Sequence, residues 1–382
     1  MLPIRILILT EILRVGGQEL FTLRQVNNID RSSYDIHIGY VGDGPLRRKL
    51  AELDIPLFQY AKTIKMYKRV WSGKIPMLYP LRVIHPVMKV VRYIRKHRIS
   101  VIQTNAVFSY VIGAIAARLT GVPSVRIQGN IMRDVEAVHY RFFQWLPFSC
   151  WTKKFVLFLE DQKDEFETLG VPEDRIYFID SFGVDLNEFH PDNPGKRIRD
   201  EFGIEHDCVV VGQAARLVPF KRFDLMIRAA RIVVDKMPDT VFLIVGDGPE
   251  RERLEQLTAK LELEGNVVFA GLRLDMPEVV AAFDIVVSLE KGSGGLSNWE
   301  AMASGKPLVS TKNEIVIHDQ TGICVTSLEI ENLANAILAL IRDPDRRFRL
   351  GKHARLVSET RYDFVKGFVP KLQQLYDELG EA

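Results

Sequence analysis

The segment DIVVSLEKGSGGLSNWEAMASGKPLVST, residues 284–311, decides the fold. It begins with an apolar run (284–289), continues through a glycine-rich loop into a helical segment, and ends in a second apolar run, PLVST (307–311). This strand–loop–helix–strand order is typical of a parallel α/β sheet. Ligands of such sheets bind beyond the carboxyl ends of the strands, so we expect chemistry in the loop that follows residue 289.

The same alternation of strands and helices extends over the rest of the chain. The linker-like segment FHPDNPGKR (189–197), with two prolines and a glycine, separates two sets of strands. We therefore predict two α/β domains, of which the first covers residues 1–188. The predicted strands are IRILIL (4–9), YDIHIGYV (34–41), SVIQT (100–104) and PSVRI (123–127) before the linker, and CVVVGQA (208–214), TVFLIVG (240–246) and NVVFAG (266–271) after it.

The composition is that of an ordinary folded protein. Of the 382 residues, 47% are hydrophobic and 26% are charged. Cys150, Cys208 and Cys324 are far apart and form no zinc-binding pattern, which favours a reducing cytosol and no metal site. The first residues read as a strand rather than a signal peptide, and no run approaches the roughly 18 apolar residues of a spanning helix. We predict a cytoplasmic protein.

The charge is unevenly distributed along the first half. The net charge is only +2, but residues 55–133 contain 14 Lys or Arg and no acidic residue. Within this span, HPVMKVVRYIRKHR (85–98) reads as an amphipathic helix with one basic side, and residues 62–71 interleave cations with apolar side chains. We predict a basic face that docks on anionic lipid headgroups; a solvated basic face and a nucleic-acid surface are the alternatives.

Two loops that follow predicted strands contain candidate phosphate ligands. Gly16 and Gly17 come before a helical segment, where backbone N–H groups approach a phosphate, although a glycine pair is equally typical of a tight turn. A full GxGxxG pattern is absent here, which counts against a nicotinamide enzyme. Arg216 and Lys221 follow the first strand of the second half, and two cations at this spacing suit a diphosphate. Their alternative interpretation is a solvated basic turn.

Glu300 is predicted to lie in the first turn of the helix that follows the glycine-rich loop. A carboxylate there can accept hydrogen bonds from a ribose diol, while loop N–H groups receive phosphate. Alternatively, it only complements the positive end of the helix dipole. The segment at 246–249, GDGP, reads on its own as a turn.

Taken together, these motifs resemble the family 4 group of retaining glycosyltransferases, which have the GT-B fold. The resemblance implies two Rossmann-like domains that face each other across a cleft. It also implies that the closing helix crosses back, so that residues 362–382 pack on the acceptor domain and residues 189–361 form the nucleotide-sugar domain. The matching stretches are GGQE (16–19), RLVPFKRFDLMIRAA (216–230), VGDGP (245–249), VVFAG (267–271), GGLSN (294–298) and EAMASGKPLVST (300–311).

The resemblance also implies roles for single residues. Arg216 and Lys221 match the family's diphosphate-binding pair. Glu300 matches its ribose-binding glutamate, and Glu290 is expected to orient the sugar ring. The further substrate-binding positions are Gly16, Gly17, Asn105, Gly295, Leu296, Ser297 and Asn298.

Three departures from the family pattern affect these assignments. Nine residues instead of seven separate Glu290 from Glu300, and Gly292 stands where the usual spacing would place an acid. The loop after Thr311 is shortened. Gln128 begins a segment in which the family often has a histidine.

The resemblance therefore predicts an enzyme that moves a hexosyl unit from a nucleoside diphosphate sugar to an acceptor hydroxyl with retention. It needs no metal or cofactor other than its donor. We expect the acceptor to be a glycan or lipid-linked molecule of cell-surface polysaccharide or glycolipid synthesis, presented at the inner membrane face, and we expect no nucleic-acid partner. A non-catalytic nucleotide-sugar binder or scaffold partner, favoured by the altered loops, and a sugar-nucleotide epimerase are the alternatives.

Overall fold

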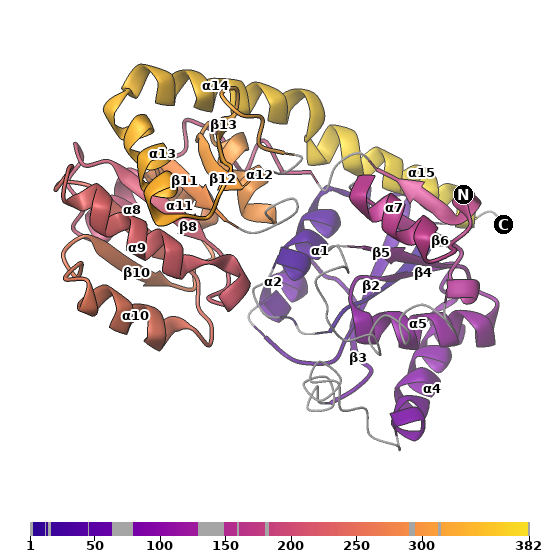
Figure 1. Cartoon of the computed structure of the whole chain (residues 1–382). Coiled ribbons are helices and arrows are strands. Elements are labelled where there is room, and N and C mark those ends of the chain that lie inside the picture. The colour runs from indigo at the N-terminus through magenta and orange to yellow at the C-terminus, as the bar shows by residue number, and fades with distance from the viewer. Residues whose placement is uncertain are drawn as a thin grey trace. The chain divides into compact units, whose positions relative to one another are not determined.

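The computed structural model divides the chain into two compact units, which we call the first and second unit (Figure 1). The first unit comprises Met1–Phe182 and Lys366–Ala382, and the second comprises Gly183–Val365. These divisions lie a few residues from the predicted ones at 188 and 362. The structure describes residues 3–11, 13, 17–44, 46–62, 79–128, 149–158, 160–179, 183–289, 295–311 and 315–380.

The described part of the first unit contains a parallel sheet of seven strands in the order β3-β2-β1-β4-β5-β6-β7. Its strands are β1 (Ile4–Leu9), β2 (Tyr34–Tyr40), β3 (Leu57–Gln59), β4 (Val101–Thr104), β5 (Ser124–Ile127), β6 (Lys154–Leu157) and β7 (Ile176–Phe178). Ile6 of β1 is in register with Ile36 on one side and Val101 on the other. Apolar side chains point to both faces of these strands because helices cover both faces of a parallel sheet.

The helices of the first unit follow its strands in alternation. Leu7 and Leu9 of β1 pack in one cluster with Val90 and Ile94 of α4, so the apolar side of this helix lies on the sheet. The helices are α1 (Gly17–Asn28), α2 (Leu46–Glu52), α4 (Tyr79–His97), α5 (Val107–Thr120), α7 (Glu160–Thr168) and α15 (Val369–Gly380), with short 3-10 turns η2 (Ser149–Trp151) and η3 (Glu173–Arg175).

The second unit repeats this architecture. Its described strands form a parallel sheet of six in the order β10-β9-β8-β11-β12-β13. The strands are β8 (Val210–Ala214), β9 (Val241–Val245), β10 (Val267–Gly271), β11 (Ile285–Ser288), β12 (Leu308–Thr311) and β13 (Gly322–Val325). The helices are α8 (Lys196–Glu201), α9 (Phe223–Val234), α10 (Arg251–Lys260), α11 (Met276–Ala282), α12 (Leu296–Ala303), α13 (Ile330–Arg342) and α14 (Pro344–Arg361), with a 3-10 turn η4 (Pro219–Lys221). The prediction of two parallel α/β domains is confirmed.

The C-terminal helix α15 belongs to the first unit. A π-helical turn, η5 (Phe364–Phe368), comes directly before it. The ring of Phe368 packs against Phe21 of α1, with 5.1 Å between ring centroids, and Tyr376 is fully buried. The chain therefore returns from the second unit to close the core of the first.

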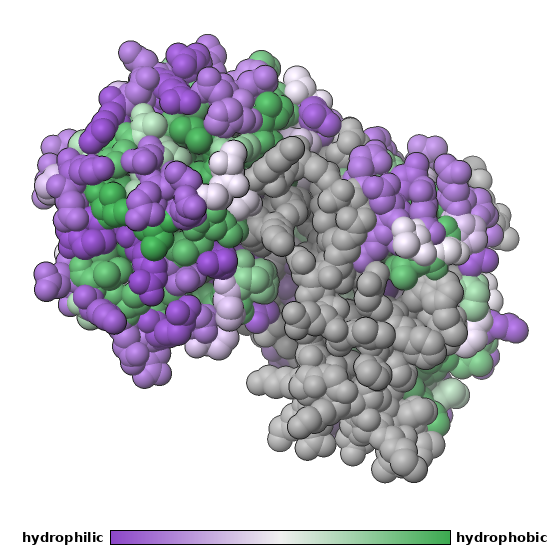
Figure 2. Space-filling model, viewed as in Figure 1, coloured by the Kyte–Doolittle hydropathy of each residue, from purple (hydrophilic) through white to green (hydrophobic). Residues whose placement is uncertain are grey.

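The surface of the second unit is mostly polar on the face shown in Figure 2, with smaller hydrophobic patches between the hydrophilic side chains. Within the residues that the structure describes, no helix combines the length and the apolar character needed to cross a bilayer.

Candidate active site

The topology of the second sheet points to one place for a ligand. The strand order reverses between β8 and β11, which are neighbours in the sheet but far apart in the chain. Two loops diverge at such a point and leave a crevice at the carboxyl ends of the strands. One loop leads from β8 through residues 215–218 to η4, and the other leads from β11 to α12.

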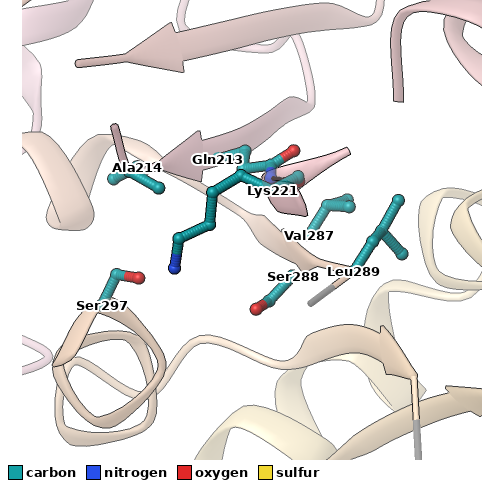
Figure 3. Close-up of a pocket in the computed structure, with 8 residues that line it drawn as sticks. Gln213, Ala214, Lys221, Val287, Ser288, Leu289 and Ser297 are labelled. Atoms are coloured by element: carbon teal, nitrogen blue, oxygen red, sulfur yellow. Dashed lines mark hydrogen bonds between the residues drawn. The ribbon is translucent and has the colours of Figure 1, made fainter. Parts of the chain in front are cut away.

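A pocket lies at this point. Ser288 and Gln213 are almost fully buried, at 6% and 3% exposure, and lie at the ends of β11 and β8. The pocket is lined by Gln213, Ala214, Ala215, Lys221, Val287, Ser288, Leu289 and Ser297 (Figure 3). It thus joins both loops of the switch point with the first turn of α12.

Lys221 brings the only charge among these lining residues. It is the last residue of η4, and its carbonyl accepts a hydrogen bond of 2.7 Å from Gln213 Nε2, which anchors the turn to β8. Its Nζ lies 5.6 Å from the ring centre of Phe220. Figure 3 shows the side chain extended toward Ser297, with Ser288 on the other side. An ammonium group beside two hydroxyl donors is suited to a phosphate.

The helix α12 faces the same pocket with its N-terminal end. Gly295 precedes it with φ of 75°, a left-handed conformation that favours glycine. Ser297, in the first turn, lines the pocket, and Asn298 is fully buried. The positive end of a helix dipole favours a bound anion.

The prediction that Glu300 lies in the first turn of this helix is wrong. The helix begins at Leu296, so Glu300 is its fifth residue, and the first turn contains no acidic residue. Charge effects of the dipole are confined to the first turn, so the helix-dipole interpretation of Glu300 loses its basis. Its side chain is 3% exposed and therefore lies inside the second unit.

Arg216 is placed differently from Lys221. Its side chain is exposed, does not line the pocket, and makes no hydrogen bond or ion pair with the residues that the structure describes. Its backbone, by contrast, lies in a tightly bonded loop. The structure therefore brings Lys221 and Ser297 together and leaves the guanidinium of Arg216 outside.

Asn105 lies inside the first unit. It is 1% exposed, and its Nδ2 donates to Thr22 Oγ1 at 2.8 Å while its Oδ1 accepts from Gln103 Nε2 at 2.8 Å. Gln103 is bonded in turn to Gln25, and Gln25 donates to the hydroxyl of Tyr376 at 2.7 Å. These contacts give Asn105 a structural role in a buried network that joins α1, β4 and α15.

The structure describes only some of the remaining predicted site residues. Gly17 begins α1. Gly16 and Glu290, and with them Gly292 and the shortened loop at 312–314, lie outside the described residues.

Two pocket residues were missed by the sequence analysis. Gln213 is a polar residue inside the apolar strand β8, and Ser288 is the last residue of β11. A polar side chain near the carboxyl end of a buried parallel strand is the signal that could have identified both.

Comparison with known proteins agrees with this geometry. Residues 195–357 match the family model "Glycosyl transferases group 1". The chain is 26% identical over 384 residues to the UDP-Gal:alpha-D-GlcNAc-diphosphoundecaprenol alpha-1,3-galactosyltransferase of Escherichia coli, covering 96% of this chain and 94% of that protein. It is 32% identical over 188 residues to a GDP-mannose-dependent phosphatidylinositol monomannoside mannosyltransferase of Mycolicibacterium smegmatis, a match that spans about half of that protein.

The fold is shared with solved structures. The crystal structure of Anabaena HepE in complex with UDP and glucose superposes with a TM-score of 0.82 at 25% sequence identity, over 99% of both chains. The structure of WaaG, a glycosyltransferase involved in lipopolysaccharide biosynthesis, has the same fold with a TM-score of 0.72. The chain is thus a glycosyltransferase of the GT-B fold, and its residues 195–357 match the group 1 glycosyltransferase model.

Proposed function

We propose that this protein transfers a hexosyl unit from a UDP-sugar to an acceptor hydroxyl, with retention of configuration, in the synthesis of a cell-surface polysaccharide or glycolipid. The observation that carries the proposal is the placement of Lys221 beside Ser288 and Ser297 at the switch point of the second sheet. The choice of UDP is supported by the E. coli relative and by the UDP bound to HepE.

Departure of the nucleotide is the demanding step of this reaction. The bond between the anomeric carbon and the diphosphate oxygen breaks, and both electrons remain on that oxygen. Lys221 stabilises the growing charge, with Arg216 reaching in from its exposed position. The acceptor oxygen bonds to the anomeric carbon, and its proton passes to the departing diphosphate oxygen. One preorganised charge donor of this kind contributes about a hundredfold or more to turnover.

Glu300 and Glu290 complete the proposed donor site. We assign Glu300 to the ribose and Glu290 to the sugar ring, with Gly16 and Gly17 on the acceptor side. For Glu300, the supporting observation is its burial on α12, whose first turn lines the pocket.

The proposed acceptor is held at an anionic membrane surface, which α4 contacts. On the exposed side of this helix, Ile84 and Met88 are 54% and 39% exposed, and Arg92 and Arg95 continue the same side. Exposed apolar residues beside cations suit a lipid interface, where each basic residue adds about 1 kcal/mol to the free energy of binding to an anionic membrane surface. The cations and aromatic residues predicted to join this surface at 65–71 lie outside the described residues.

Vesicle sedimentation tests the membrane contact. The protein should sediment with anionic vesicles, remain in solution with neutral ones, and be released by high salt. Changing Arg92 and Arg95 to Gln should weaken sedimentation, whereas Arg118→Gln, an exposed cation on α5, should leave it unchanged. Equal sedimentation with both kinds of vesicle would remove the membrane from the proposal.

Nucleotide release tests the enzymatic function. The protein is mixed with UDP-glucose, UDP-galactose or UDP-N-acetylglucosamine, each together with a lipid-linked acceptor that takes the hexosyl unit, and free UDP is measured over time. We expect one donor to yield UDP in many turnovers. Tight binding of UDP without release from any donor would instead favour the non-catalytic nucleotide-sugar binder, for which the altered loop around Gly292 is the argument.

A further inference from the structure

We propose that the loop at residues 246–250, after β9, is a backbone clamp that positions Arg216, and that Gly248 is a positioning residue for its guanidinium. The inference rests on the proposed function, because it assigns Arg216 to the diphosphate of the donor. It gives a role in the reaction to a segment that on sequence alone reads as a simple turn.

The position of Arg216 is determined by its backbone. Its side chain is exposed and forms no bond with the described residues, so only the adjoining main chain sets where the guanidinium can reach. The residue before it, Ala215, donates its N–H to Val245 O at 3.0 Å, and the residue after it, Leu217, donates to Asp247 O at 3.0 Å. Leu217 O accepts from Glu250 N at 3.1 Å. Arg216 is therefore held on one side by the last residue of β9 and on the other by the loop that follows this strand.

Two glycines allow this contact. A Cβ atom placed on Gly248 would lie 2.4 Å from Leu217 O, and one on Gly246 would lie 2.0 Å from Ala215 O. Both distances are far below van der Waals contact, so a side chain at either position must displace the Arg216 loop or its own loop. Gly246 also has φ of 131°, which other residues rarely adopt, but Gly248 carries no such backbone constraint. A substitution at Gly248 therefore tests the close approach alone.

The first unit contains the same arrangement of main-chain hydrogen bonds between two loops. The sequence VGDGP occurs at 41–45 after β2 and again at 245–249 after β9, two strands with equivalent places in their sheets. In the first unit, Leu13 N donates to Gly42 O at 3.0 Å and Leu46 N donates to Leu13 O at 3.0 Å. The loop after the second strand thus holds the loop after the first strand in both units. Because it recurs, we infer that the clamp forms before any nucleotide binds.

The test measures UDP affinity by calorimetry on the full chain. Arg216→Ala should weaken UDP binding about tenfold, the size expected for one lost charge-assisted hydrogen bond. Gly248→Ala should weaken it to a similar extent, because displacing Leu217 moves Arg216. Gly265→Ala is the matched control, since a Cβ there has no atom within 4 Å, and it should bind UDP as the wild type does.

A double-mutant cycle separates positioning from a general structural effect. In the Arg216→Ala background, Gly248→Ala should weaken UDP binding by less than twofold, because the residue it positions is already gone. Losses that multiply in the double variant would overturn the inference. If the wild type does not bind UDP, the proposed function fails rather than the clamp.

Amide hydrogen exchange on the wild-type protein tests the clamp without any substitution. The amides of Leu217 and Glu250 should be protected from exchange before UDP is added. Free exchange of both amides in the absence of UDP would overturn the inference. This test uses only the wild-type protein, so it holds even if Gly248→Ala does not fold.

Discussion

Replacing Lys221 by Met removes one charge from the pocket and shortens the side chain by only one heavy atom. The other described residues that line the pocket are uncharged, so none of them replaces the lost cation. Loss of one preorganised donor to a leaving group costs about 2.7–4 kcal/mol, or a hundredfold to a thousandfold in kcat. The Coulomb energy between two unit charges about 4 Å apart, at an effective dielectric constant of about 20, is roughly 4 kcal/mol, which agrees with this loss.

The assay is UDP release at saturating UDP-sugar and acceptor, together with urea unfolding. The kcat of Lys221→Met should fall by at least a hundredfold. Its stability should change by less than about 0.5 kcal/mol, because the bond from Gln213 ends on the Lys221 carbonyl, which the variant keeps. Lys236→Met, an exposed lysine just after α9, serves as control and should leave both quantities unchanged. A kcat for Lys221→Met within twofold of the wild type would refute the role of this lysine.

Three further predictions concern stability in urea unfolding. Tyr376→Phe leaves a buried N–H of Gln25 without its acceptor and should lower the unfolding free energy by about 1–3 kcal/mol. Tyr177→Phe is the control, because its hydroxyl donates to the same helix α15 at a more exposed position, and it should lower the unfolding free energy much less. Arg222 precedes α9 with φ of 55°, so Arg222→Gly should raise the unfolding free energy by about 0.5–1 kcal/mol, and Arg222→Ala, which keeps the strained backbone, should not. Burial lowers the pKa of Lys306 from its ordinary value of 10.5 to about 8. Between these two pH values the unfolded chain holds a proton that the folded chain has lost, so the stability of the wild type relative to Lys306→Met should rise with pH across this window, by roughly 1–3 kcal/mol. A flat difference between the two proteins would contradict this.

The two-domain fold could be predicted because its determinants are local. The apolar strand runs and the helical spacing at 223–234 are visible in the sequence, and the linker at 189–197 separates the two sets. The place of the site followed from the same pattern, because loops at the carboxyl ends of strands converge at a switch point. Lys221 was singled out in this way, whereas Ser297 was named only because of the family resemblance.

The start of α12 and the surroundings of Asn105 depend on residues distant in the chain. Trp299 of this helix packs edge-to-face on Tyr362, with 4.3 Å between ring centroids. The helix begins at Leu296, although Leu296 and Ser297 read locally as loop. Asn105 was predicted to bind substrate because the family resemblance implies it. Its partners come from α1 and from a chain of bonds that ends at Tyr376 on α15, and no local pattern indicates them.

The most direct test of the central claim is a crystal structure of the protein with UDP. We predict that the diphosphate lies at the switch point of the second sheet, with an oxygen within hydrogen-bonding distance of Lys221 Nζ and the N-terminal end of α12 facing it. A diphosphate bound elsewhere, or one at this place without contact to Lys221, would contradict the account.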